Sequence, residues 1–351
     1  MRSTINSTTL GASRLWRMAW SSTGIGGGVG NFLLATRCAP RYPICMTIYI
    51  PISQLLNAKR TQLIGYTSLG GIVGALFGLA CSLLYRRNRS VVQQLRRAIA
   101  TDKLRMVYQP IVNLATRRIV GAEALVRWID EEGFAVGPDI FVKLAEERGF
   151  VGALTKLVVH RVLHDFAKSL RSHPDFRLSI NVAGADLADP TFLPMLEREV
   201  HHADIPAQCL AIEITESSAV KSLTAMETIH RLRQQGHSVH IDDFGTGYSS
   251  LSYLNDLSVD AIKIDRSFTQ AIGTGSVIGS ILPQILAIVD SMKLDVIVEG
   301  IETEEQANYF ANADGEILAQ GWLFGHPVPA NEFHRIAADN EKAQLVPMDW
   351  A

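Results

Sequence analysis

Residues 239–251 read Val-His-Ile-Asp-Asp-Phe-Gly-Thr-Gly-Tyr-Ser-Ser-Leu, a short apolar run that ends in two acids and a glycine-containing segment. Its opening, Ser238 to Ile241, is short, apolar and rich in β-branched residues, which predicts a buried strand. An Asp-Asp pair ends the strand. Gly245 and Gly247 follow and permit backbone angles closed to other residues, so they predict a tight loop.

We expect the two carboxylates of this pair to have different roles. Adjacent strand residues point to opposite faces of a sheet, so Asp242 and Asp243 should not share one role. One can bind a cation inside the mouth of a barrel while the other braces it or reaches it from a second direction. The alternative is an ordinary polar strand end followed by a turn.

Charge is distributed unevenly along the 351 residues, although the net charge is only −2. Residues 1–89 contain ten Arg and Lys and no Asp or Glu, whereas residues 90–351 contain 23 basic and 35 acidic residues. The acidic excess argues against binding of long nucleic acid. It favours a site built from carboxylates that bind metal.

One uncharged stretch, Leu63 to Tyr85, is long enough to cross the hydrocarbon core of a bilayer. Tyr66 and Tyr85 lie where interfacial aromatic residues belong, and a cluster of arginines at 86, 87 and 89 follows. We predict a transmembrane helix over 63–85 with its C-terminal end in the cytoplasm. The alternative is a buried helix of a soluble protein.

The segments on either side of this span are less distinctive. Residues 1–62 show no sustained period, although 46–56 resembles a strand and its exit. Small residues recur in the span at Gly70, Gly74 and Gly78, a spacing that lets two helices pack closely in lipid. Residues 86–103 are predicted to be a helical linker, in which Val91, Leu95 and Ile99 continue this dimer contact.

From residue 104 to about 340 the chain alternates between strand and helix patterns. Strands are expected at 106–112, 120–128, 177–182, 209–215, 238–241, 261–264, 295–298 and near 317–318, and helices at 138–147, 152–170, 190–201, 218–235, 267–292 and 304–313. Apolar strands that alternate with helices indicate an α/β fold. About eight strands predict a (β/α)8 TIM-type barrel, and two strands before the first helix predict a modified one.

Polar side chains occur near the ends of successive expected strands. They are Glu123, Asn181, Glu213, Asp242, Lys263, Glu299 and Gln320. After Asn181, neighbouring members of this set are 21 to 36 residues apart, about one βα unit. The C-terminal ends of the strands carry the active site in this class of barrel, so we expect these side chains to converge there.

A set of converging carboxylates resists ionisation unless cations neutralise it. Oxygen ligands with an amide among them suit Mg²⁺ or Mn²⁺ rather than Zn²⁺. Two such ions bridged by an Asp suit the attack of water on phosphorus. Lys263 could orient that water or stabilise negative charge, and Glu299 could accept its proton. Taken singly, each acid could equally be an ordinary salt bridge or helix cap.

The region from about Leu104 to Phe333 resembles the EAL domain, the cyclic di-GMP phosphodiesterase family of bacteria. The motifs that carry the resemblance are Tyr108-Gln109-Pro110-Ile111, Glu123-Ala124-Leu125, Asp242-Asp243-Phe244-Gly245-Thr246-Gly247, Lys263-Ile264-Asp265, Glu299-Gly300-Ile301-Glu302-Thr303 and Gln320-Gly321. A lone Glu-Ala-Leu carries no weight, whereas this ordered set is specific.

The resemblance implies a role for each matching position. Glu123, Asn181, Glu213 and Asp242 would hold a first metal ion, Asp243 would share a second, and Lys263 and Glu299 would act on the attacking water. Gln109, Arg127, Gln320 and Asp265 would bind or line the substrate, and Glu302 would support the loop Phe244–Tyr248.

The resemblance also implies a function and a cellular setting. The protein would hydrolyse cyclic di-GMP to linear pGpG with two Mg²⁺ or Mn²⁺ ions, as a homodimer in the inner (cytoplasmic) membrane of a bacterium, with a single or remnant double pass and the barrel in the cytoplasm. The alternative is a receptor module that binds cyclic di-GMP without cleaving it. A sugar hydrolase with two carboxylates would not need Lys263, Asn181 and the further acids together.

Some members of the family carry a periplasmic sensor with two cysteines between two membrane helices. Residues 38–85 resemble the end of that arrangement, as if the first helix and most of the sensor were missing. Cys38 and Cys45 could then pair if their segment is exported. The chain's other cysteines, Cys81 and Cys209, are expected to be small core residues, because four scattered cysteines do not make a zinc site.

Overall fold

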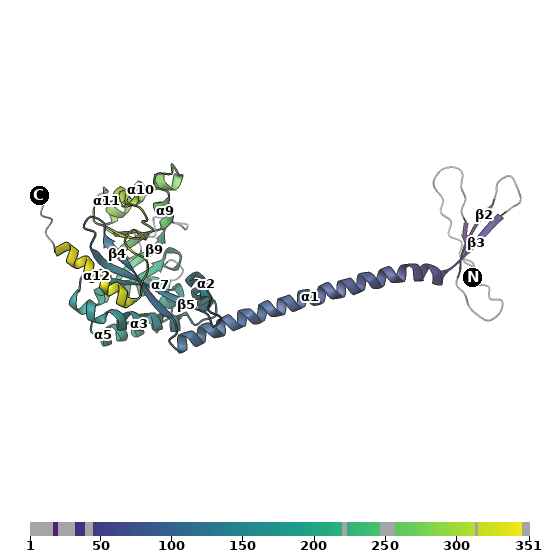
Figure 1. The fold of residues 1–351 in the computed structure, drawn as a ribbon, viewed down its shortest axis with the longest axis horizontal. Coiled ribbons are helices and arrows are strands. Elements are labelled where there is room, and N and C mark those ends of the chain that lie inside the picture. The colour runs from purple at the N-terminus through teal and green to yellow at the C-terminus, as the bar shows by residue number, and fades with distance from the viewer. Residues whose placement is uncertain are drawn as a thin grey trace. The chain divides into compact units, whose positions relative to one another are not determined.

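A computed structural model describes residues 17–19, 32–38, 45–219, 223–245, 257–312 and 315–345. The chain divides into two compact units, residues 1–88 and residues 89–351 (Figure 1). The second unit contains all the predicted site residues.

The first unit contains a small antiparallel sheet and most of a long helix. The strands are β1 (Arg17–Ala19), β2 (Phe32–Cys38) and β3 (Cys45–Pro51), in the order β1-β2-β3. The register between β2 and β3 places the backbone of Cys38 opposite that of Cys45. Their pairing as a disulfide stays a prediction. Helix α1 (Ile52–Ala100) begins directly after β3.

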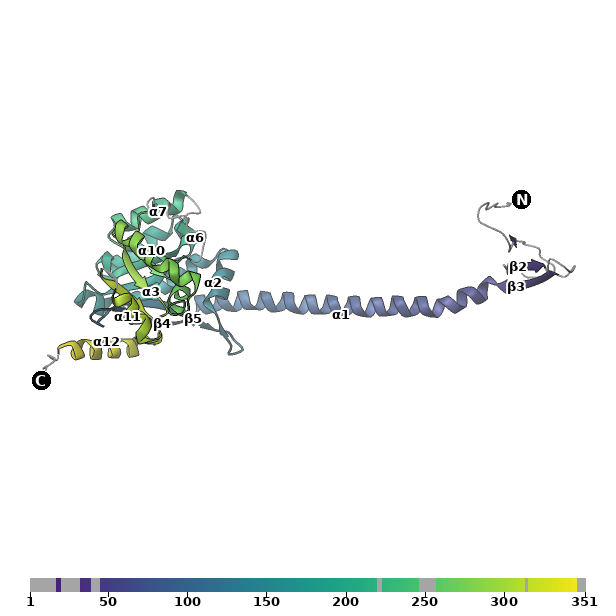
Figure 2. The same ribbon diagram turned by 90° about the horizontal axis from the view of Figure 1, so that it is seen from above.

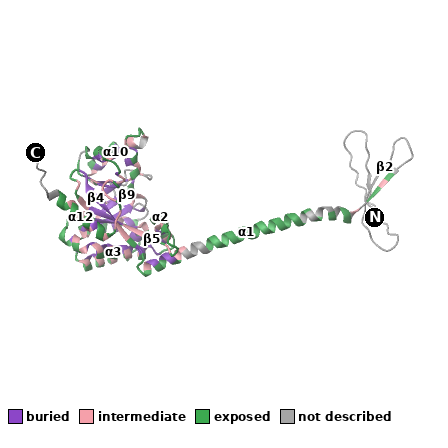
Figure 3. Ribbon diagram, in the orientation of Figure 1, coloured by how far each residue is buried: buried purple, intermediate pink, exposed green. Residues whose placement is uncertain are grey.

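Within α1, the segment Ile64–Tyr85 is long and apolar enough to cross a membrane, by length and composition. Its side chains are exposed throughout (Figure 3). A soluble helix would bury its apolar face, so this exposure agrees with the predicted span. The described boundaries differ from the predicted 63–85 by one residue.

The last turns of α1 belong to the barrel unit, which begins at residue 89. Leu95 is fully buried and Ala98 nearly so, both in the core of the barrel unit. The Gln94 side chain donates to both carboxylate oxygens of Glu132, at 3.2 and 3.0 Å. Leu95 therefore cannot contact a second membrane-proximal helix as predicted.

The barrel unit contains nine further strands and eleven further helices among its described residues. The strands are β4 (Arg105–Asn113), β5 (Ile119–Ile129), β6 (Ala135–Val136), β7 (Arg177–Asn181), β8 (Leu210–Thr215), β9 (Ser238–Phe244), β10 (Ala261–Ile264), β11 (Asp295–Val298) and β12 (Ile317–Gln320). The helices are α2 (Pro138–Glu147), α3 (Val151–Ser172), α4 (Gly184–Leu187), α5 (Phe192–Ala203), the 3₁₀ helix η1 (Ala207–Cys209), α6 (Glu216–Ala219), α7 (Leu223–Gln234), α9 (Arg266–Gln270), α10 (Val277–Met292), α11 (Glu304–Ala311) and α12 (Ala330–Leu345).

Eight of these strands close into a barrel with helices outside it (Figure 2). The order is β4-β12-β11-β10-β9-β8-β7-β5, and β4 also pairs with β5. Strand β4 runs antiparallel to both of its neighbours, while the other pairs in the ring are parallel. The prediction of a modified TIM-type barrel is confirmed. The short β6, which pairs with the far end of β5, was not predicted.

One expected helix is interrupted in the described part of the chain. The single helix predicted over 267–292 is α9 and α10, because Gly273 and Gly275 lie between them with φ of +77° and +69°. These left-handed conformations end a helix. Of the helix predicted over 218–235, the described residues as far as Gln234 belong to α6 and α7, and residues 220–222 lie outside the described part of the chain.

An aromatic cluster holds the antiparallel strand β4 in the ring. Tyr108 is fully buried against Phe166 and Phe333, with ring centroids 4.5 and 6.4 Å away. Its hydroxyl donates to Asp165 Oδ2 at 2.6 Å, so the one polar group of this buried side chain has a hydrogen-bond partner. The next residue, Gln109, is thereby fixed at the predicted site.

Gly321 is essential to the packing of the strand end that carries Gln320. A Cβ there would overlap the backbone O, N and C atoms of Ile301, and backbone cannot move aside as a side chain can. We expect Gly321→Ala to lower the free energy of unfolding by about 2–3 kcal/mol. Denaturant unfolding of the full-length protein in detergent measures the change.

The matched control is Gly152→Ala in α3, where a Cβ would lie 3.5 Å from Asp186 Oδ1, an ordinary contact. This substitution should raise stability by up to about 1 kcal/mol, because alanine favours the helix. Equal effects of the two substitutions would show that Gly321 is not sterically required.

Candidate active site

Lys263 lies at the centre of the candidate site. Its side chain is fully buried, and four carboxylates from four other strands or strand ends surround its ammonium. The distances from Lys263 Nζ are 2.8 Å to Glu299 Oε1, 2.9 Å to Glu213 Oε2, 3.1 Å to Asp242 Oδ1 and 3.4 Å to Glu123 Oε2. The predicted convergence of polar strand ends is therefore present in the structure.

The barrel's register brings these side chains to one level. Asn181 pairs with Glu213 and Glu213 pairs with His240 across the parallel strands β7, β8 and β9. Every second residue of a strand points into the barrel. The residue two positions beyond His240, Asp242, therefore faces the interior one layer nearer the C-terminal end.

Amides hold Glu123 on the other side of the cluster. Asn181 Nδ2 donates to Glu123 Oε1 at 2.8 Å, and Gln320 Nε2 donates to Glu123 Oε2 at 2.7 Å. Gln320 Nε2 also lies 2.9 Å from Gln109 Oε1, and Gln109 Nε2 donates to the carbonyl of Gly325. The structure thus connects the predicted ligands Glu123 and Asn181 with the predicted substrate residues Gln109 and Gln320.

The expectation that Asp242 and Asp243 point to opposite faces is wrong. The pairing of β9 with β10 shifts register between Ile262 and Ile264, and Asp243 has a φ of +53°. This irregularity breaks the alternation of side chains. Carboxylate oxygens of both residues lie within 4.8 Å of each other and of Glu299. A non-glycine residue in the left-handed region is strained and is common at functional sites.

The first glycine of the predicted loop, Gly245, has a backbone conformation that favours glycine, as expected. Gly245 has a φ of +94°, and a Cβ there would lie 2.5 Å from the ring of Phe268. Only glycine combines that angle with so close an approach. Gly247 and the rest of the loop Phe244–Tyr248 beyond Gly245 lie outside the described residues.

The pKa values of two buried glutamates beside Lys263 are shifted in opposite directions. Burial alone would raise the pKa of Glu123, but Lys263 and the hydrogen bonds from Gln320 and Asn181 outweigh it and hold the pKa below its usual range. Burial raises the pKa of Glu213 well above its usual range despite Lys263, and the charges of Glu123 and Asp242 add to the effect. The amide donors to Glu123 and the neighbouring negative charges at Glu213 together account for the difference.

The pKa shifts of Glu299, Asp243 and Lys263 indicate an excess of negative charge at the site. Burial raises the pKa of Glu299 to about 7, with Asp242 and Glu123 adding to burial and Lys263 opposing it. Burial, Asp242 and Asp265 raise the pKa of Asp243. Burial would lower the pKa of Lys263, but the four carboxylates outweigh it and raise this pKa well above its usual value. One ammonium does not neutralise the cluster.

The donor set fits hard divalent cations. Two groups have oxygen atoms within 4.8 Å of one another, Glu123–Glu213–Asp242 and Asp242–Asp243–Glu299, with Asp242 common to both. Glu213 Oε1 is buried without a hydrogen-bond partner among the described residues, so it is available to a ligand. Carboxylate oxygens at this density suit Mg²⁺ or Mn²⁺. Glu299, predicted as a proton acceptor, also lies where it could bind a cation.

Three predicted residues do not contact the cluster directly. Arg127 Nη1 donates to the carbonyl of Val126 at 3.0 Å. Asp265 Oδ1 accepts from the backbone N–H of Ser267 and caps α9. Glu302 is exposed, and the loop that it was predicted to support lies outside the described residues. The substrate and loop roles of these residues stay predictions.

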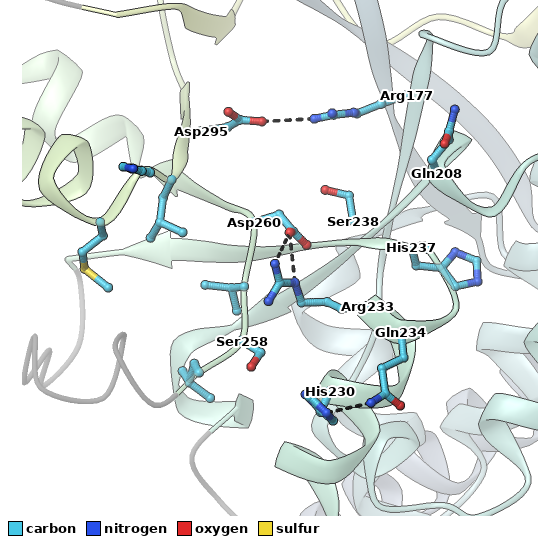
Figure 4. A pocket seen from close by; sticks show the side chains of 16 residues that line it. Arg177, Gln208, His230, Arg233, Gln234, His237, Ser238, Ser258, Asp260 and Asp295 are labelled. Atoms are coloured by element: carbon cyan, nitrogen blue, oxygen red, sulfur yellow. Dashed lines mark hydrogen bonds and ion pairs between the residues drawn. The ribbon is translucent and has the colours of Figure 1, made fainter.

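A cavity of about 900 Å³ lies at the opposite end of the barrel, around the starts of β9 and β11 (Figure 4). Both arginines that line it are paired with acids, Arg177 with Asp295 at 3.2 Å and Arg233 with Asp260 at 2.8 Å. A barrel of this class has its active site at the C-terminal ends of the strands. We therefore place the active site at Lys263.

One buried polar residue beside the carboxylate cluster, His240, was not predicted from the sequence. His240 Nδ1 lies 4.0 Å from Glu213 Oε1, and both residues are almost fully buried. The period of two in β9 could have identified it, because His240 shares the inward face with Asp242.

The family model of the EAL domain matches residues 92–327. This chain therefore belongs to the EAL domain family. It is 35% identical over 298 residues to the probable cyclic di-GMP phosphodiesterase PdeB of Escherichia coli, which covers 85% of this chain and 57% of PdeB. It is 36% identical to the cyclic di-GMP phosphodiesterase NbdA of Pseudomonas aeruginosa over 68% of this chain and 30% of NbdA.

Among solved structures, the PaMucR phosphodiesterase in complex with cyclic di-GMP is similar, with a TM-score of 0.64 and 29% identity. The match covers 69% of this chain and 98% of that one. The resemblance seen in the sequence and the TIM-type fold are thus confirmed. The chain spans little more than half of PdeB and less than a third of NbdA.

Replacing Lys263 tests whether the four carboxylates depend on its ammonium for their stability. Lys263→Met removes the counter-charge of four buried carboxylates at similar volume. We expect the free energy of unfolding in chelator at pH 8 to fall by about 3–5 kcal/mol. The loss should shrink at pH 5, because protonation of the carboxylates removes their mutual repulsion. Denaturant titrations at both pH values measure it.

Lys342→Met is the control, because Lys342 is an exposed lysine 3.7 Å from Asp339. It should change stability by no more than about 0.5 kcal/mol at either pH. A Lys263→Met protein as stable as the parent at pH 8 would mean that the carboxylates do not depend on this ammonium.

Proposed function

We propose that this chain hydrolyses cyclic di-GMP to linear pGpG, with two Mg²⁺ or Mn²⁺ ions. The observation that carries the proposal is the group of four carboxylates around Lys263, in which Asp242 belongs to both candidate cation-binding groups. Two adjacent cation sites that share an aspartate suit displacement at phosphorus. The relatives named as cyclic di-GMP phosphodiesterases support the same substrate.

The residues would divide between two ions. Glu123, Asn181, Glu213 and Asp242 would hold the first, and Asp243 would share the second with Asp242. When bound, such ions supply Lewis-acid activation of the phosphoryl group and of the attacking water.

The chain's own side chains would do the remaining work. Lys263 keeps the carboxylates in place and puts positive charge beside the phosphoryl oxygens. Glu299, with a pKa of about 7, is suited to take a proton from water near neutral pH. Gln109 and Arg127 would bind a guanine and a phosphate, and Gln320 and Asp265 would line the substrate.

Hydrolysis by the purified full-length protein tests this proposal. Cyclic di-GMP should be cleaved to pGpG with Mg²⁺ or Mn²⁺ and not in excess chelator. Ca²⁺ should support cleavage poorly, because it prefers looser and higher coordination. Glu299→Gln should lower turnover by roughly 10² or more, while binding of cyclic di-GMP is largely kept. Chromatography of the nucleotide products follows the reaction.

The control is Glu305→Gln, which removes an exposed glutamate in the first turn of α11 that belongs to neither candidate cation-binding group. It should retain parental turnover. Cleavage that persists in chelator would contradict the metal assignment. Binding of cyclic di-GMP without cleavage under any of these metals would instead support the receptor alternative.

We also propose that Ile64–Tyr85 anchors the protein in the inner membrane with the barrel in the cytoplasm. The span's length and exposed apolar side chains support insertion, and the arginines at 86, 87 and 89 support the orientation. A homodimer held by the row Gly70, Gly74 and Gly78, and an extracytoplasmic sensor before the span, belong to the same proposal. A Cβ at any of these glycines would meet no other atom within 4 Å.

The orientation can be measured with reporters fused to the C-terminus. A fluorescent protein that folds only in the cytoplasm should be bright, and alkaline phosphatase, which is active only after export, should be inactive. Replacing the three arginines after the span with serine should weaken this orientation, because the positive-inside bias is reduced. Active phosphatase on the parent chain would contradict the proposed topology.

A further inference from the structure

The interior of the barrel is not filled below the carboxylate cluster. A cavity of about 490 Å³ is lined by residues of seven of the eight barrel strands and reaches the N-terminal strand ends at Arg177 and Asp295. Barrels of this class normally fill this region with bulky side chains. Here Gly121, Ser179 and Ala261 contribute little volume, so space remains beneath the active site.

His240 occupies the boundary between this cavity and the cluster. It lines the cavity, is 2% exposed, and its Nδ1 has no hydrogen-bond partner among the described residues. Glu213 Oε1, 4.0 Å away, is also buried without one. Buried polar atoms without hydrogen-bond partners lower the stability of the folded protein. Two such atoms that face each other avoid this penalty if a hydrogen bond connects them, directly or through a water.

The other ring nitrogen of His240 has a partner that can set the tautomer. Ser238 Oγ lies 2.9 Å from His240 Nε2. If the hydroxyl of Ser238 donates to Nε2, Nδ1 carries the hydrogen and faces Glu213 Oε1.

A distance of 4.0 Å is too long for a direct hydrogen bond. It can be closed by a small side-chain rotation or bridged by one water, for which the cavity below has room. Either connection fixes the second oxygen of Glu213 from inside the barrel, while Lys263 Nζ contacts the first at 2.9 Å.

We propose that His240 is a positioning residue that donates from Nδ1 to Glu213, directly or through one water of the cavity, and so preorganises Glu213 for the divalent cation. This inference rests on the metal dependence of the proposed function. Donors behind a metal ligand fix its orientation, and their loss typically weakens metal affinity 10- to 100-fold.

The affinity of chelator-stripped full-length protein for Mn²⁺, measured calorimetrically in detergent, tests the role without requiring turnover. His240→Leu keeps the bulk and removes the donor, so affinity should fall roughly 10- to 100-fold. His240→Asn places an amide N–H near the position of Nδ1 and should stay within about threefold of the parent. Ser179→Ala is the matched control, because Ser179 Oγ is equally buried in the same cavity.

The outcomes separate this inference from the proposed function. A parent protein that does not bind Mn²⁺ would defeat the metal dependence itself. A parent that binds Mn²⁺ and a His240→Leu protein that binds it equally well would overturn only the role of His240. The role is also overturned if His240→Asn is as weak as His240→Leu, because an N–H donor near the position of Nδ1 would then not restore the affinity for Mn²⁺. Should His240→Leu not fold, His240→Ala replaces it with the same expectation.

Discussion

The buried ammonium of Lys263 is the interaction on which the rest of the site depends. Each contact with a carboxylate near 3 Å contributes about 5 kcal/mol at an effective dielectric constant near 20. Repulsion between two carboxylates within 4.8 Å costs about 3–4 kcal/mol on the same scale. With four carboxylates, their mutual repulsion and the cost of their desolvation offset most of the attraction to Lys263. Further positive charge would therefore stabilise the site.

The closed barrel is what makes this arrangement possible. Its strands bring acids that are far apart in the sequence to one ring, and its core excludes the water that would screen them. The register shift in β9 adds Asp243 to the ring, at the cost of a left-handed backbone conformation. Below the ring lie His240 and the partly empty interior.

Much of this could be predicted from the sequence because strand period and spacing are local signals. The positions of Glu123, Asn181, Glu213, Asp242, Lys263 and Glu299 followed from the βα repeat and from the family motifs. The common direction of Asp242 and Asp243 did not, because a bulge depends on the neighbouring strand. Burial of Leu95 against the barrel and the facing of His240 with Glu213 arise from tertiary packing, which a helical or strand period alone does not specify.

Anomalous diffraction from crystals grown with Mn²⁺ and a slowly cleaved cyclic di-GMP analogue tests the central claim most directly. The account predicts two manganese peaks, both in contact with Asp242, one also with Glu213 and the other also with Asp243. Electron density for the analogue at the C-terminal ends of the barrel strands, with no manganese peak at these carboxylates, would contradict the account.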